Sequence, residues 1–440
     1  QSGLLFQALY SPGSDAYFVQ SIFELEGEIE VSVFKKAWQK VSDHHPILRT
    51  GFAWQNLEIP LQYTLEAAEV PFEVKDWRSS TEEEQRKKLE IFISDDRRKG
   101  FELNKAPLFR LALAQCSVNR YYFMWSQHHI LTDGWCISII LGDVFKAYEA
   151  LRQGGKLQLI SRRPYRDYIS WLQEQDLKKA EFFWKDYLAF LEEPTKLSFK
   201  SIIEKNQEKD YDNYAIALSV EETDEVKIFA QENGLTLNTV IQGAVGLVLK
   251  TYTQQQDVVM GVTVSGRNIN LSGVEEMVGL FINTLPLKIT CAPTESTVSF
   301  LKGLQDQTQK INDYAHISLA QIQSWSGINQ SLFDVIFVFE NYPLDEEVHN
   351  IASNFTIRCL QGIEKTEYPL TISVGPGKQL HLSLSYQTEH FNEELIRRFS
   401  AHVKVMLQEI LHRSEERPQT LSLLTAKEKD QLLIEWNDTK

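Results

Sequence analysis

The stretch "HHILTDG", from His128 to Gly134, places two imidazoles, a carboxylate and a glycine at short spacing. An apolar run precedes it, and a run with apolar residues at helical spacing follows it, which predicts a strand-to-helix connection. Side chains over such connections commonly do chemistry. Metal binding, acid–base catalysis and plain packing are the three explanations to weigh.

Metal binding has the least support. Adjacent residues on a strand point to opposite faces, so His128 and His129 cannot easily share one ion. The sequence has no HExxH motif and no third ligand cluster nearby, and we expect no metal. Packing is a fair explanation for a lone histidine pair, such as His44 and His45 beside Pro46, where we expect a structural role. The full HHxxxDG pattern is harder to explain in that way.

Acid–base catalysis fits the residue types best. An imidazole titrates near neutral pH and can accept a proton from an incoming amine or alcohol. Asp133 would orient the loop, and Gly134 would allow close approach of the backbone. The sequence lacks a GxSxG elbow, a Walker loop and a GxGxxG fingerprint, which argues against serine hydrolases and dinucleotide enzymes. "GPGK" at 375–378 predicts only a turn.

The bulk composition indicates a two-lobed globular protein. A chain of 440 residues with 43% hydrophobic residues exceeds one ordinary core. The formal charge of -15 argues against nucleic acid and anionic membranes as partners. We see no signal peptide and no apolar stretch of membrane-spanning length. The four cysteines form no CxxC pair, which favours reduced, mostly buried thiols and a cytoplasmic location.

The elements that must hold the motif follow from hydrophobic periodicity. We expect helices over 31–42, 135–151 and 236–252, the last capped by Thr236 or Asn238. We expect strands at 47–52, 257–267 and 332–343, the last closed by Pro343, and two paired strands within 106–129. Both halves mix helices with strands, which predicts an α/β fold with a boundary near residues 175–200.

HHILTDG resembles the HHxxxDG core motif of condensation domains from nonribosomal peptide synthetases. Further segments resemble the other motifs of that family in order: "HHPILRTGF" at 44–52, "RPYRDYISW" at 163–171, "VTVSGRN" at 262–268, "MVGLFINTLPLKI" at 277–289, "YAHISLAQIQ" at 314–323 and "FDVIFVFENYP" at 333–343. Pro46 stands where glutamate is common in the family. The ending "LLIEWNDTK" is similar to the connector that leads into an adenylation domain, so we expect one segment of a longer chain.

The resemblance implies two chloramphenicol-acetyltransferase-like lobes, 1–175 and 176–430, followed by the start of a connector at 431–440. The lobes would form a V with a central tunnel at the motif. An upstream carrier domain would bring an acyl or peptidyl thioester, and the amine of a downstream aminoacyl thioester would attack it. Both would arrive on phosphopantetheine arms, so the domain itself would need no cofactor and would be a monomer when excised.

The resemblance also implies roles for particular residues. His129 would take or steer the proton of the amine, and His128 would be structural. Asp133 would pair with Arg49, so that Arg49→Ala would harm both folding and turnover. Five more residues are candidates for lining the cleft: Asn283, Ser265, Arg267, His316 and Trp135. Each has a plainer explanation: a turn cap for Asn283, loop contacts for Ser265 and Arg267, an ordinary surface or core position for His316, and the core for Trp135.

Three other functions remain open from the sequence. An epimerisation domain of the same systems shares the histidine motif, a free-standing acyltransferase would use the same chemistry, and an inactive copy could recruit a partner. The opening "GLLFQALYSPGSDAYFVQ" at 3–20 resembles the subgroup that accepts a donor of D configuration.

Overall fold

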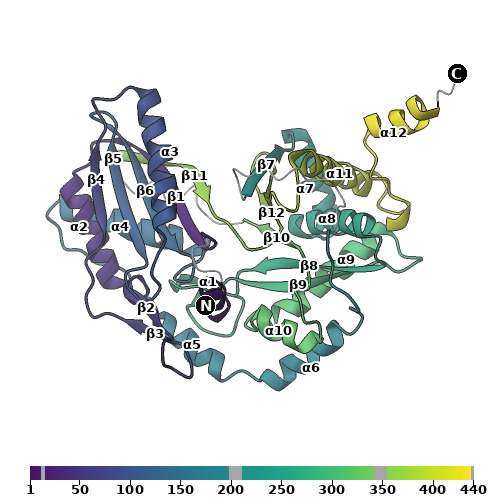
Figure 1. Ribbon diagram of the computed structural model, residues 1–440, viewed down its shortest axis with the longest axis horizontal. Helices are drawn as coiled ribbons and strands as arrows, with labels where there is room; N and C mark the ends of the chain where they lie inside the picture. The colour runs from purple at the N-terminus through teal and green to yellow at the C-terminus, as the bar shows by residue number, and fades with distance from the viewer. Residues whose placement is uncertain (11–14, 198–210, 341–353, 438–440) are drawn as a thin grey trace. The chain divides into compact units, whose positions relative to one another are not determined.

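The computed structural model describes residues 1–10, 15–197, 211–340 and 354–437, and it divides the chain into two units (Figure 1). The N-terminal unit comprises Gln1–Gln175, Ile269–Phe281 and Tyr342–Thr366, and the C-terminal unit comprises Asp176–Asn268, Ile282–Asn341 and Glu367–Lys440. The prediction of two contiguous lobes, 1–175 and 176–430, is therefore wrong in one respect. Two later segments return to the N-terminal unit, where one adds a strand to its sheet and the other packs near HHILTDG.

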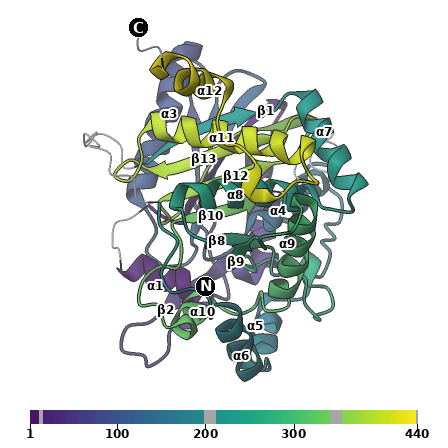
Figure 2. The same ribbon diagram turned by 90° about the vertical axis from the view of Figure 1, so that its right-hand side faces the viewer.

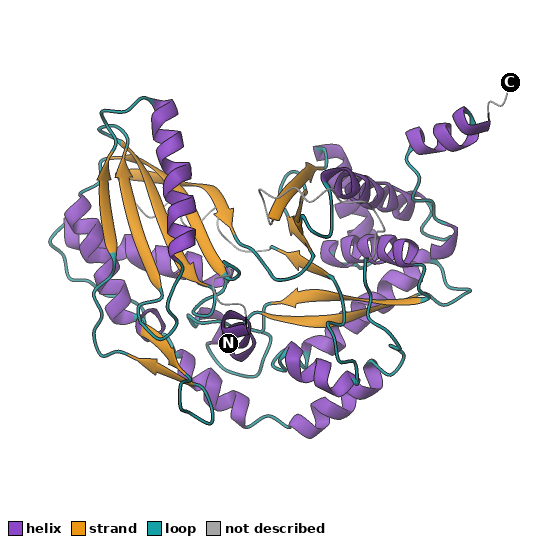
Figure 3. Ribbon diagram, viewed as in Figure 1, coloured by secondary structure: helices purple, strands orange, loops and turns teal. Residues whose placement is uncertain are grey.

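The sheet of the N-terminal unit has five strands in the order β11-β1-β6-β5-β4 (Figure 3). Their bounds are β1 (Phe18–Gly27), β4 (Phe72–Asp76), β5 (Phe109–Gln115), β6 (Arg120–His128) and β11 (Phe355–Ile363). Neighbours are antiparallel except β4 and β5, so the sheet is mixed. The predicted strand pair within 106–129 is confirmed as β5 and β6. A short ribbon of β2 (Thr50–Ala53) and β3 (Leu61–Thr64) lies apart from this sheet.

The helices of this unit are α1 (Ser2–Tyr10), α2 (Val31–His44), α3 (Glu82–Lys99), α4 (Gly134–Arg152) and α5 (Tyr165–Gln173), with 3-10 turns η1 (Pro46–Arg49) and η2 (Val274–Glu276). α2 and α4 share one hydrophobic cluster with the odd-numbered side chains of β6, and α3 packs on the even-numbered ones. Alternation along β6 thus buries both faces. The strand expected at 47–52 begins only at Thr50, because Pro46 starts a 3-10 turn.

The C-terminal unit contains a second mixed sheet, of six strands in the order β7-β13-β12-β10-β8-β9. Their bounds are β7 (Tyr211–Ala217), β8 (Asp257–Val264), β9 (Asn283–Thr290), β10 (Val335–Phe339), β12 (Leu370–Gly375) and β13 (His381–Gln387). Strands predicted within 257–267 and 332–343 are confirmed as β8 and β10, while Pro343 lies outside the described residues. The "GPGK" segment joins β12 to β13, so the predicted turn is also confirmed.

Helices of this unit are α6 (Leu177–Tyr187), α7 (Val220–Glu232), α8 (Leu237–Thr253), α9 (Thr297–Asn312), α10 (Leu319–Ser326), α11 (Glu393–His412) and α12 (Ala426–Leu433), with 3-10 turns η4 (Pro418–Thr420) and η5 (Glu435–Asn437). Thr236, rather than Asn238, caps α8, because its side chain accepts a hydrogen bond from the Thr239 amide. α8 and α11 pack beside each other (Figure 2).

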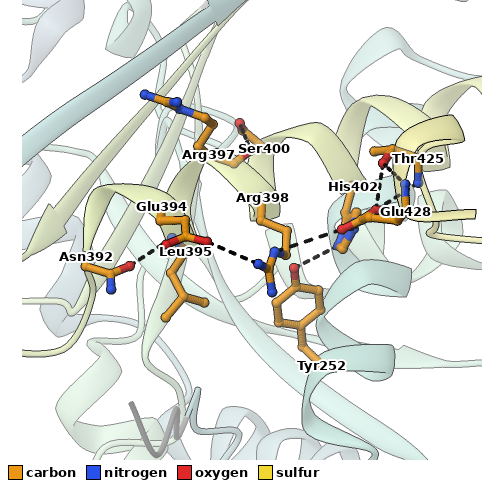
Figure 4. Close-up of polar contacts among 10 residues, drawn as sticks. All are labelled: Tyr252, Asn392, Glu394, Leu395, Arg397, Arg398, Ser400, His402, Thr425 and Glu428. Atoms are coloured by element: carbon orange, nitrogen blue, oxygen red, sulfur yellow. Dashed lines mark hydrogen bonds and ion pairs between the residues drawn. The ribbon is translucent and has the colours of Figure 1, made fainter. Parts of the chain in front are cut away.

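Polar side chains attach the last helix, α12, to the C-terminal unit (Figure 4). His402 on α11 bonds Glu428 on α12 at 3.0 Å through Nε2 and the Tyr252 hydroxyl at 2.8 Å through Nδ1. Glu428 also accepts from the Thr425 amide at 2.9 Å, which completes a capping box at the start of α12. The predicted connector begins within α12, and its last residues, 438–440, lie outside the described part. A membrane-crossing helix is absent from the part of the chain that the structure describes.

Candidate active site

The histidine pair lies where β6 leaves the sheet of the N-terminal unit. The His128 amide donates to Leu108 O at 3.0 Å, and the His129 amide donates to Tyr17 O at 2.8 Å. The end of β6 is therefore fixed on both sides, toward the segment before β5 and toward the segment before β1. α4 begins at Gly134, so the motif forms the predicted strand-to-helix connection.

His128 is buried and engaged by its own loop. Its Nδ1 accepts a hydrogen bond from the Ile130 amide at 3.1 Å, which leaves the ring hydrogen on Nε2. Burial, with a smaller effect of neighbouring His129, lowers the pKa of His128 to about 3. The ring is neutral at physiological pH and holds the loop, in keeping with the structural role predicted for it.

His129 presents its ring to a carboxylate that the sequence did not suggest. Nε2 lies 3.1 Å from Glu364 Oε1, and the His129 side chain is 12% exposed. Nδ1 is buried and has no hydrogen-bond partner among the described residues. Burial alone would lower the pKa of His129, but the charge and hydrogen bond of Glu364 outweigh it and raise the pKa to about 9. In the free protein the ring is therefore an imidazolium at neutral pH.

Charged residues hold the segment that carries Glu364. Arg97 on α3 donates to Asp15 Oδ2 at 3.0 Å and to Ile363 O at 3.5 Å. Lys365 lies 2.7 Å from the same Asp15 oxygen. Desolvation would raise the pKa of Glu364, but His129 and, more weakly, Arg97 favour the carboxylate and lower it. Glu364 is ionised at neutral pH beside the charged ring.

Asp133 binds the segment Ile269–Phe281 that returns to this unit. Its Oδ2 accepts from the Phe281 amide at 3.0 Å, and its Oδ1 lies 3.3 Å from Cys136 Sγ. Cys136 Sγ in turn accepts from the Gly279 amide at 3.3 Å. The aspartate and the first turn of α4 thus hold a stretch that is distant in sequence.

Gly279 lies where three of the family-like motifs contact one another. A Cβ at this position would lie 2.0 Å from Tyr165 Cδ2, so only glycine fits against that ring. The Tyr165 hydroxyl donates to Leu280 O at 2.5 Å. The motifs at 128–134 and 163–171 therefore meet the first part of the motif at 277–289, up to Phe281, in the N-terminal unit around Asp133 and Tyr165.

The predicted ion pair between Arg49 and Asp133 is wrong. Among the described residues, Arg49 donates instead to four main-chain carbonyl oxygens, of Ser42, Asp43, Leu65 and Glu66. Its rigid fork of donors suits carbonyls that face it from the end of α2 and from the segment after β3. Arg49 therefore supports the ribbon and α2, and the amide of Phe281 takes the place expected for it at Asp133.

His45 belongs to a buried network rather than to the candidate site. Its Nε2 lies 2.8 Å from Asp143 Oδ2, and Arg162 donates to the same carboxylate at 2.5 Å. Burial lowers the pKa of His45, although Asp143 opposes the shift. The network fits the structural role predicted for the His44 and His45 pair, and it also accounts for Arg162, whose role the sequence did not suggest.

Trp135 does not belong to the core, so the prediction of a core position is wrong. The side chain of Trp135 is half-buried, whereas the next residue, Cys136, is fully buried. On α4, Cys136, Ile140 and Val144 are the side chains buried in the hydrophobic cluster shared with β6. Gly134 is half-buried as the first residue of this helix.

The other candidates belong to the C-terminal unit, and their proximity to His129 stays a prediction. Asn283 begins β9, and its side-chain Nδ2 donates to Ala315 O at 2.9 Å and Ile317 O at 2.5 Å. It thereby clamps the loop that carries His316, a half-buried residue whose pKa is lowered by burial. Arg267 is buried and its amide donates to Ser265 Oγ at 3.4 Å, which closes the turn after β8.

Neither a metal centre nor a disulfide is present in the described part of the chain. No group of three or more His, Cys, Asp or Glu side chains is placed to hold an ion there. Cys116, Cys136 and Cys291 are buried, and Cys359 is exposed.

Comparison with known proteins gives matches over nearly the whole chain. A family model described as "Condensation domain" matches residues 1–433. One of the linear gramicidin synthase proteins of Brevibacillus parabrevis is 39% identical over 448 residues, which is 100% of this chain and 6% of that protein. Bacitracin synthase 3 of Bacillus licheniformis is 34% identical, over 100% of this chain and 7% of that protein. The chain thus spans a small fraction of these relatives.

Among solved structures, the first condensation domain of the calcium-dependent antibiotic synthetase, bound to a substrate analogue, is similar in fold. The two agree with a TM-score of 0.79 over 96% of this chain and 97% of that one, at 16% identity. At such low identity the likeness concerns the fold alone, and it agrees with the two mixed sheets described above.

Proposed function

Because this chain belongs to the condensation-domain family of nonribosomal peptide synthetases, whose members form amide bonds by acyl transfer, we propose that it joins two carrier-bound thioesters. An upstream carrier domain supplies an acyl or peptidyl donor, and a downstream carrier domain supplies an aminoacyl acceptor. The acceptor nitrogen attacks the donor carbonyl, the C–N bond forms, the C–S bond breaks, and a proton moves from nitrogen to the thiolate sulfur.

The chemistry demands little of the protein beyond alignment. A thioester is already activated, and an α-amino group with a pKa of about 7.7–8.0 is partly free base at neutral pH. Aligning two tethered reactants contributes up to ~7–11 kcal/mol, whereas general-base assistance typically contributes ~10²–10⁴-fold. Positioning therefore contributes more to the rate than base catalysis, and a single well-placed imidazole suffices for the proton.

The observation that carries this proposal is the environment of His129. Its main chain is held by hydrogen bonds at the end of β6, and the ring nitrogen Nε2 meets a half-exposed carboxylate rather than the core. His128 and Asp133 hold the loop from within, so we assign them to support of the motif.

His129→Ala tests the proposal. Donor and acceptor thioesters are loaded on carrier domains, and the amide product is followed by mass spectrometry. We expect a loss of roughly 100-fold or more in rate in a protein whose circular dichroism spectrum matches that of the wild type. His381→Ala, which removes an exposed histidine on β13, is the matched control and should keep full rate. A His129→Ala protein that still makes peptide at the wild-type rate would refute a catalytic role.

We propose in addition that the donor has D configuration, on the resemblance of residues 3–20 to that subgroup. Assaying matched D- and L-donor thioesters tests this, and a preference for the L-donor contradicts it. Epimerisation is the alternative outcome: a single carrier-bound aminoacyl thioester would then change configuration without forming an amide. A recruiting copy would do neither.

The remaining proposals concern the context of the chain. We propose that an adenylation domain follows it in the same polypeptide, that it works in the cytoplasm, and that the excised chain is a monomer. Phosphopantetheine belongs to the carrier domains as part of the substrates. Light scattering of the purified chain tests the monomer.

A further inference from the structure

Glu364 contacts the nitrogen of His129 that a substrate must reach. Nδ1 is buried, so the ring can meet a substrate only through Nε2, and Nε2 is already 3.1 Å from Glu364 Oε1. The Glu364 side chain is 45% exposed, so it can turn away without unpacking a core. The acceptor amine must therefore either displace this carboxylate or bind to it.

The charges around the His129 ring allow Glu364 to exchange the imidazolium for another cation. Within the N-terminal unit, His129 faces Glu364 from the end of β11, Asp133 from the start of α4 and neutral His128 beside it. Arg97 on α3 acts on Glu364 but is itself paired with Asp15. While Glu364 holds Nε2, the charged ring cannot accept a proton from an amine.

We propose, building on the proposed function, that Glu364 receives the ammonium group of the acceptor amino acid and thereby frees Nε2 of His129 to act as the base. An arriving cation competes with the imidazolium for the same carboxylate, and two adjacent positive charges disfavour each other, so the ring releases its proton to solvent. A positively charged acceptor thus makes Nε2 of His129 available as a base, whereas an uncharged acceptor leaves it paired with Glu364.

The protons and bonds of this scheme balance. The ammonium gives one proton to Nε2, and the resulting amine attacks the thioester carbonyl. The C–N bond forms as the C–S bond breaks, and a second proton from nitrogen ends on the thiolate sulfur. The products are amide, free thiol and His129 imidazolium, which rejoins Glu364.

Glu364→Gln separates recognition of a charge from a merely structural contact. Wild-type protein is first screened with a panel of aminoacyl N-acetylcysteamine thioesters to find the best acceptor. The 2-hydroxyacyl thioester with the same side chain then serves as an uncharged competitive inhibitor. We expect Glu364→Gln to raise KM for the aminoacyl acceptor roughly 10- to 100-fold, the range of a lost hydrogen bond to a charged group, and to leave Ki of the hydroxy compound within about twofold.

The second measurement is the pH dependence of kcat/KM, together with an NMR titration of His129. Removing the carboxylate leaves burial as the main influence, so the pKa of His129 falls and the acid limb of the profile moves to lower pH. Glu26→Gln, which removes an exposed carboxylate on β1, should change neither readout.

Each outcome of these experiments decides one proposal. Equal weakening of the amino and hydroxy compounds, or an unshifted pH profile, refutes the role of Glu364 while the condensing activity stands. A wild-type protein that forms no amide with any acceptor of the panel, nor with carrier-bound substrates, refutes the proposed function itself.

Discussion

Replacing Gly279 by alanine should destabilise the N-terminal unit through a single added methyl group. That methyl would lie 2.0 Å from Tyr165 Cδ2 and 2.6 Å from both Cγ and Cε2. The ring cannot move aside easily, because it packs on Phe281 with ring centroids 5.2 Å apart and its hydroxyl donates to Leu280 O. Relief of the clash therefore shifts the segment that Asp133 holds.

The size of the effect follows from two contributions. Overpacking a buried site costs about 1–3 kcal/mol. Losing the hydroxyl-to-carbonyl bond of Tyr165 adds about 0.5–1.5 kcal/mol. Together they lower the free energy of unfolding by about 1.5–4.5 kcal/mol, or the melting temperature by roughly 3–18 °C for a unit of this size. Amide formation should fall as well, because Phe281 and the loop of Asp133 shift together.

Thermal unfolding followed by circular dichroism measures this loss. Gly303→Ala is the matched control, since Gly303 lies within α9 and an added Cβ there meets nothing within 4 Å. It should raise stability by about 0.5–1 kcal/mol, because alanine suits a helix interior better than glycine. The same substitution thus has opposite signs at the two sites.

A double variant tests the stated cause. Tyr165→Ala removes the ring that the new methyl strikes, so Gly279→Ala should cost little in that background. A Gly279→Ala protein that melts at the wild-type temperature would refute the reasoning. So would a cost that persists unchanged when the ring is absent.

Three further predictions concern the residues that hold the site. Arg49→Lys should lower the free energy of unfolding by about 2–4 kcal/mol, because one ammonium group cannot bind four carbonyls arranged around a guanidinium. Urea titration measures this free energy, and an unchanged value contradicts the assigned contacts. Asp133→Ala should cost about 2–4 kcal/mol by leaving the buried Phe281 amide unpaired, whereas Asp133→Asn should cost less because its oxygen still accepts; equal losses in the same titration argue against this bond. The pair of His129 and Glu364 should stabilise the fold most at pH 5–6.5, since the raised pKa of the ring means that this stabilisation is lost as pH rises through about 9. The free energies of unfolding of wild type and Glu364→Gln, compared from pH 5 to above pH 9, check this prediction. A stability difference between the two that grows above pH 9 refutes it.

Local signals in the sequence predict the helices and strands that hold the candidate site. The helix over 31–42 and the strands within 106–129 follow from hydrophobic spacing, which neighbouring residues impose through the geometry of a helix or strand. The corner at His128 and Asp133 is recognisable for the same reason, because its residues are close in sequence. The cap of α8 at Thr236 is likewise a short-range feature.

Contacts between distant segments do not follow from such local signals. Glu364 reaches His129 only because β11 pairs with β1, and the hydrophobic pattern near residue 364 does not predict this pairing. The family resemblance implied a pair of Asp133 and Arg49, but the fold offers Arg49 four carbonyls and Asp133 the Phe281 amide. A chain of given sequence limits which side chains can do chemistry, but the registry of its sheets and the return of two segments decide which of them meet.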